Sequence, residues 1–77
     1  MKYEKILNTT WEFLENNYKG SEITFPMWVF LVYKMCDTKY CLKQCLKLLW
    51  SQWEWLDKED REYHKNWLKY NFNVVVK

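Results

Sequence analysis

Four side chains in this sequence are of types that bind transition metals or act as nucleophiles: Cys36, Cys41, Cys45 and His64. Their spacings lack the paired-cysteine knuckle that is usual in zinc sites. We therefore expect buried thiols at helix positions, and neither a metal ion nor another cofactor. An odd number of cysteines without a signal peptide also favours reduced thiols inside a cell.

No set of residues has the pattern of a catalytic site. His64 is the only histidine, and no serine or cysteine nucleophile is linked to it by a recognisable motif. A group of acids falls where we expect a helix to begin, and the helix dipole stabilises negative charge at that end; these acids are Asp57, Glu59, Asp60 and Glu62. We expect that the protein is not an enzyme.

The lysines give a weak indication of a partner. The net charge is only +2, but residues 1–38 carry a net −1 and residues 39–77 a net +3. Lys39, Lys43 and Lys47 recur at helical spacing and form a basic stripe. This stripe fits a track along nucleic-acid phosphates and an ordinary solvated face equally well.

Composition and periodicity place these residues in one small helical domain. The chain has 77 residues, of which 49% are hydrophobic and 21% aromatic, and this excludes disorder. One glycine and one proline argue against a fold of many strands. Apolar spacing predicts four helices, at about 3–18, 27–36, 39–53 and 57–70, with an extended tail at 71–76.

Residues at the helix boundaries support these spans. Gly20 is a plausible stop for the first helix, Pro26 suits the first turn of the second, and Asp37-Thr38 and Asp57 are N-cap candidates. The extended segment before Pro26 is a candidate to lie against the tail. The second helix is apolar on nearly every side, which indicates unusual burial or the use of one face for a ligand. The longest near-apolar run, residues 25–33, is too short to span a membrane.

Two stretches resemble the high-mobility-group (HMG) box family over residues 26–70. Pro26-Met27 leads into a helix with aromatic residues at Phe30 and Tyr33, as in the first helix of a box. Trp53, Leu56, Asp57, Asp60 and Arg61 match the junction of its second and third helices. The chain departs from the family in a shorter span between Met27 and Trp53, in the lack of basic residues before Pro26, and in the additional helix at 3–18.

The resemblance implies an all-α fold with an L-shaped three-helix core and an extra N-terminal helix. We divide the chain accordingly into residues 1–20 and a box-like domain at 21–77. The implied core comprises Phe30, Tyr33, Trp53, Leu56 and Tyr63, with His64 as the alternative to Tyr63. The implied DNA contacts are Trp28, Lys34, the basic stripe of Lys39, Lys43 and Lys47, and two apolar wedges, Leu31 and Leu42.

Two functions of different classes follow. The first is an architectural protein that binds the minor groove of bent or distorted double-stranded DNA with little sequence preference, inside the cell in the nucleus or another DNA-containing compartment. The second is a small helical protein–protein interaction module that has lost DNA binding. It is favoured by the low charge and by six tryptophans, which are too many for one small core. In that case the helix at 3–18 supplies a protein partner or homodimer interface. Neither function involves a membrane.

Overall fold

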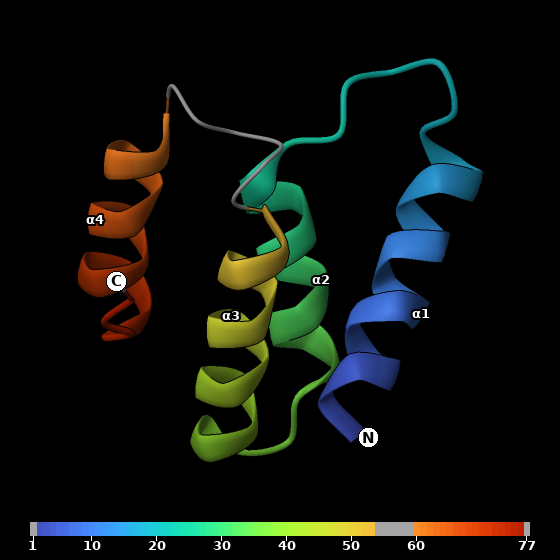
Figure 1. Cartoon of the computed structure of the whole chain (residues 1–77). Coiled ribbons are helices and arrows are strands. Elements are labelled where there is room, and N and C mark those ends of the chain that lie inside the picture. Colours follow the sequence, from blue (N-terminus) through green and yellow to red (C-terminus); the bar gives the residue numbers. More distant parts are fainter. Residues whose placement is uncertain (1, 54–59, 77) are drawn as a thin grey trace.

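The computed structural model describes residues 2–53 and 60–76, which form four helices and contain no strand. The predicted all-α fold is confirmed. The helices follow one another as α1 (Lys2–Asn17), α2 (Phe25–Met35), α3 (Lys39–Trp53) and α4 (Arg61–Phe72) (Figure 1).

Local sequence signals explain where the helices begin and end. Pro26 lies in the first turn of α2, and the Thr24 hydroxyl accepts the backbone N–H of Met27 at 3.4 Å. Thr38 caps α3, because its hydroxyl accepts the N–H of Cys41 at 3.0 Å. Gly20, which follows α1, has a φ of +86°, a left-handed conformation that favours glycine. The N-cap predicted at Asp57 lies outside the described residues.

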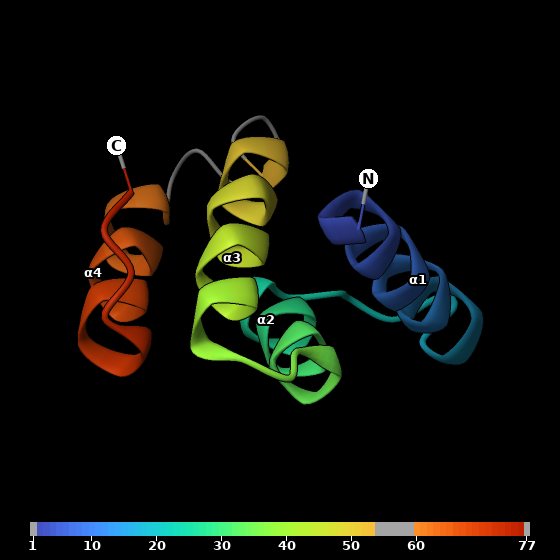
Figure 2. The same ribbon diagram turned by 90° about the horizontal axis from the view of Figure 1, so that it is seen from below.

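The first three helices pack against one another in every pairing, and α4 is added at one side. In Figure 1, α3 stands between α4 and α1, and α2 lies behind it; Figure 2 shows the same arrangement from below. Aromatic rings join α4 to α2, and the guanidinium of Arg61 stacks 3.9 Å from the centroid of the Trp50 ring of α3.

One hydrophobic core includes residues of all four helices and of the tail. Phe25 is at its centre: its ring meets those of Trp53 at 5.5 Å, His64 at 4.7 Å and Trp67 at 6.2 Å between centroids. Helix α1 contributes four residues that are buried, Ile6, Leu7, Thr10 and Leu14. The helix predicted as a separate unit at 1–20 is therefore part of the same folded body as the rest.

The core predicted from the resemblance is wrong in three of its members. The side chains of Phe30, Tyr33 and Tyr63 are 52%, 54% and 67% exposed, whereas Trp53 is buried as expected. The physical reason in α2 is that an all-round apolar helix offers more than one stripe at helical spacing. The stripe that the structure buries is Phe25, Trp28, Val29 and Val32. Leu56 lies outside the described residues.

The C-terminal tail packs on the core without forming a strand. Val74 and Val76 are buried and Val75 is exposed, an alternation that fits an extended segment with one side covered. In Figure 2 the tail runs back along α4. Among the described residues, no helix is both long enough and apolar enough to cross a membrane.

Candidate functional site

The structure brings the three cysteines together where α2 ends and α3 begins. Cys36 is the C-cap residue of α2, and Cys41 and Cys45 lie on successive turns of α3. A two-residue connection, Asp37 and Thr38, reverses the chain between them. The Thr38 cap fixes the start of α3 and thereby sets the direction in which Cys41 faces.

The three sulfur atoms form a compact triangle. The thiol of Cys41 donates to the Cys36 sulfur at 3.5 Å, and the thiol of Cys36 donates to the Cys45 sulfur at 3.7 Å. All three sulfurs lie within 4.8 Å of one another. Cys41 and Cys45 are buried, Cys36 is partly exposed, and all three are free thiols.

Burial keeps the thiols of Cys36 and Cys45 protonated. It raises the pKa of Cys36 to about 11, with a further contribution from the hydrogen bond of Cys41. Burial also raises the pKa of Cys45, and the neighbouring Cys36 thiol adds to this effect. Such thiols are poor nucleophiles at neutral pH, because the thiolate is the reactive form. The cluster is therefore suited to structure or to ligation rather than to nucleophilic catalysis.

A carboxylate and two phenols interact electrostatically in and around the cluster. Asp37 adds to the rise in the pKa of Cys36 after burial and the neighbouring Cys41 thiol, and the phenol of Tyr3 interacts electrostatically with Tyr40, Cys41 and Cys45. Desolvation, and after it these neighbours, raise the pKa of Tyr3.

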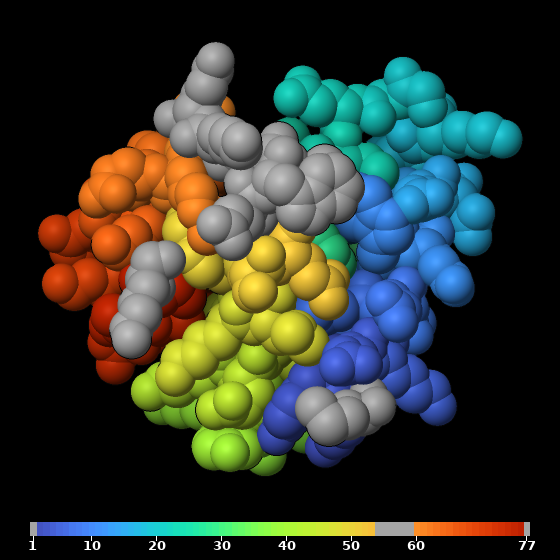
Figure 3. All heavy atoms as spheres, viewed as in Figure 1, coloured from blue at the N-terminus to red at the C-terminus, as the bar shows by residue number. Residues whose placement is uncertain are grey.

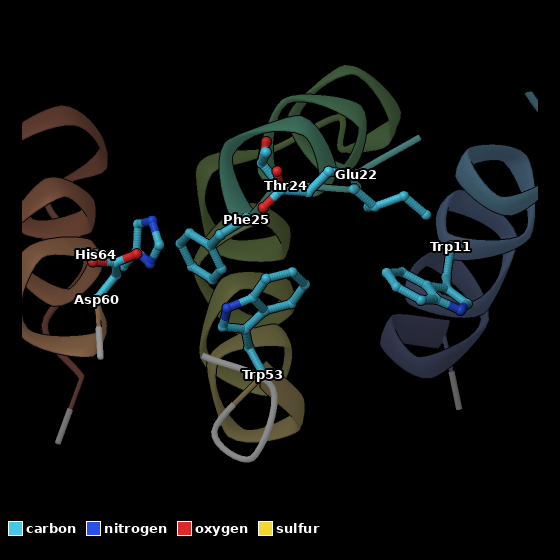
Figure 4. A pocket seen from close by; sticks show the side chains of 8 residues that line it. Trp11, Glu22, Thr24, Phe25, Trp53, Asp60 and His64 are labelled. Atoms are coloured by element: carbon cyan, nitrogen blue, oxygen red, sulfur yellow. The ribbon is translucent and has the colours of Figure 1, made fainter. Parts of the chain in front are cut away.

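His64, the fourth residue considered for this chemistry, lies elsewhere. Its imidazole packs on the ring of Phe25 and lines a cavity of about 310 Å³ between α1, α2, α3 and α4. Figure 4 shows Trp11 entering this cavity from α1, Trp53 from α3, and His64 and Asp60 from the side of α4. The indole N–H of Trp53 is buried and has no hydrogen-bond partner among the described residues.

The prediction that Trp28 contacts DNA is wrong, because the side chain lies in the core. Trp28 is buried, and its indole N–H donates to the hydroxyl of Thr10 at 2.8 Å. The ring is also packed against Trp11, with 4.8 Å between centroids. An indole held in this way is part of the core and is not available to stack on a base. The α1 helix, which has no counterpart in the HMG box, covers it.

The other predicted DNA contacts divide into exposed and half-buried residues. Leu31 and Leu42, the predicted wedges, are partly buried and pack against the core. The four lysines are exposed: Lys34 on α2, and Lys39, Lys43 and Lys47 on α3. Helix α3 contains no acidic residue, so its three lysines have no counter-charge within the helix.

Apolar side chains from the C-terminal end of α1, from the residue that follows it and from α2 lie around one groove. Phe13 and Tyr18 on one side and Met27, Phe30 and Leu31 on the other line a groove of about 250 Å³, in which Lys34 is the only charged lining residue. We call these five apolar residues the α1–α2 apolar face. In the front view of Figure 3, α1, α3 and α4 make up most of the surface and little of α2 is visible.

The sequence contains one signal for the cysteine cluster and one for the α1–α2 apolar face. For the cysteine cluster, this signal is the four-residue spacing of Cys41 and Cys45, which places both on one face of a helix. The all-round apolar character of α2 indicated either unusual burial or the use of one of its faces for a ligand. Comparisons of this chain with models of protein families, with curated proteins and with solved structures find no match.

Proposed function

We propose that this chain is a small helical protein-interaction module that associates with a second copy of itself through the α1–α2 apolar face. The observation that supports this proposal is the exposure of large apolar side chains around one groove: Phe13 is 49% exposed and Phe30 52%. Contiguous apolar surface of this kind is uncommon on a monomer and often marks an interaction site.

The face has the features of a self-complementary interface. Phe13 and Phe30 line a groove of about 250 Å³ and are about half exposed, so a two-fold arrangement lets the face of one copy cover the groove of the other. A net charge of +2 produces little repulsion between copies. A standard interface buries about 800 Å² on each partner, which is about a seventh of the 5680 Å² surface of this molecule.

Sedimentation of the full chain over a concentration series tests this function. We expect a monomer–dimer equilibrium that Phe13→Glu abolishes, because a dimer then buries an unpaired carboxylate. Phe13 is half-exposed, so the change leaves the core intact. Tyr70→Glu is the matched control, since Tyr70 is 82% exposed on α4 and outside the face. A wild-type chain that stays monomeric up to high concentration, or an equal effect of both variants, contradicts the proposal.

A second candidate function rests on a different observation, the basic stripe of α3. Lys39, Lys43 and Lys47 are exposed and have no acid in the same helix. This arrangement favours the DNA-binding function that the HMG-box resemblance implies, with the lysines placed along phosphates. The second candidate does not involve Trp28.

Binding to four-way-junction DNA, measured as a function of salt, tests the second candidate. We expect Lys43→Glu to weaken binding and to lower the slope of log affinity against log salt by roughly one unit. Lys5→Glu makes the same charge change on an exposed position of α1 and serves as the control. No shift of the labelled junction at low salt, with the protein folded, would exclude DNA binding.

A further inference from the structure

The cysteine cluster has the geometry of a metal site. An ion bonded at about 2.3 Å to three sulfurs holds them about 3.8–4.0 Å apart. Two of the three distances in the cluster are 3.5 and 3.7 Å, and the third is below 4.8 Å. The fold has therefore already brought two of the three sulfur pairs to within a few tenths of an ångström of the separation that an ion requires, and the third pair to within about an ångström of it.

The ligands are also held by independent parts of the backbone. Cys41 and Cys45 are four residues apart in α3, a spacing that places both sulfurs on one side of the helix. Cys36 comes from α2, and its backbone N–H donates to the carbonyl of Val32, which fixes its position at the helix end. Little chain entropy remains to be lost when an ion binds to such a site.

We propose that Cys36, Cys41 and Cys45 bind one thiophilic metal ion as three thiolates, and that Cu(I) is the preferred ion. Thiolate ligands select Cu(I) and Zn(II) among the common metals. Zn(II) in structural sites almost always has four protein ligands, whereas within the described residues no histidine or carboxylate joins the three sulfurs. A three-ligand site made only of sulfur therefore favours Cu(I).

Binding of the ion to the three cysteines involves no change of oxidation state. Three S–H bonds break and three metal–sulfur bonds form, so each ion that binds releases three protons to the solvent. Binding also ties the end of α2 to the beginning of α3.

The test uses the full chain, reduced and kept under anaerobic conditions. Cu(I) is added in competition with a chromogenic Cu(I) chelator, and the thiolate-to-copper absorption in the near ultraviolet is followed. We expect one ion per chain, and we expect Cys36→Ser to weaken binding by more than about tenfold, because loss of an outer-shell partner alone has an effect of that order. Cys36 is partly exposed at a helix end, a position where serine is tolerated.

A control variant and an alkylation assay complete the test. Met35→Leu removes a neighbouring exposed sulfur and is the matched control, for which we expect unchanged affinity. In the wild-type chain, bound Cu(I) is expected to protect all three thiols from iodoacetamide, a result that depends on no variant. Equal affinity of Cys36→Ser and the wild type, or thiols alkylated at the metal-free rate, would overturn the site. Displacement of Cu(I) by an equal concentration of Zn(II) would overturn the preferred ion.

Discussion

At the scale of single residues, a polar side chain inside the core connects two consecutive helices. The Thr10 hydroxyl donates to the carbonyls of Ile6 and Leu7 within α1 and accepts the indole N–H of Trp28 in α2. Thr10 is the only polar residue of the described chain that is buried. Helical spacing places Thr10 on the same stripe as Ile6, Leu7 and Leu14. Its bond to Trp28 could not be predicted, because it depends on how α1 and α2 pack.

This bond leads to a prediction about stability. Thr10→Val keeps the shape of the side chain but removes the acceptor, and it leaves the Trp28 N–H buried without a partner. We expect a loss of about 1–3 kcal/mol in the free energy of unfolding, measured by urea denaturation.

Two related variants separate the hydrogen bond from packing. Thr10→Ser retains the hydroxyl and is expected to lose less stability than Thr10→Val. In a Trp28→Phe background, which has no indole N–H, the effect of Thr10→Val is expected to shrink. An equal effect of Thr10→Val in both backgrounds would show that the bond to Trp28 contributes nothing.

At the scale of helices, the sequence predicted the elements well and their contacts poorly. The spans of the first three helices agree with the structure within two residues, because their caps are local: Pro26 and Thr38 act within one turn. The choice of buried stripe in α2 is not local. It depends on which neighbours cover the helix, and here the stripe of Phe25 and Trp28 is the one covered. Phe30 and Tyr33 are left half-exposed as a result.

The cysteine cluster illustrates the same limit for the candidate sites. The sequence placed Cys41 and Cys45 on one helical face, since their spacing alone decides this. The approach of Cys36 depends on the angle at which α2 meets α3 across Asp37 and Thr38, and no local pattern encodes that angle. A spacing that lacks the usual zinc pairing is therefore compatible with three sulfurs within 4.8 Å.

At the scale of the whole molecule, the four helices are not bound together equally. Helices α1, α2 and α3 pack on one another in every pairing. Helix α4 is joined to them chiefly by side-chain rings: Trp67 contacts Phe25 and Phe30, and Phe72 contacts Phe30 and Tyr33. Regions with fewer buried contacts open at lower free energy than the remainder of a domain. Helix α4 is thus the element expected to open first.

Amide hydrogen exchange on two variants tests this division. Phe72 is partly buried at the ring contacts of α4. Phe72→Ala is therefore expected to lower the free energy needed to open α4 locally by roughly 1–2 kcal/mol. That is about a tenfold faster exchange of α4 amides, with those of α1–α3 unchanged. Phe25 of α2 is fully buried against α3 and α4. Phe25→Ala is therefore expected to lower the free energy of unfolding of the whole domain by about 3–5 kcal/mol and to accelerate exchange in all four helices. If Phe72→Ala instead accelerates exchange equally throughout, α4 opens only with the whole domain, and the ring contacts bind it as firmly as the pairwise packing binds α1, α2 and α3.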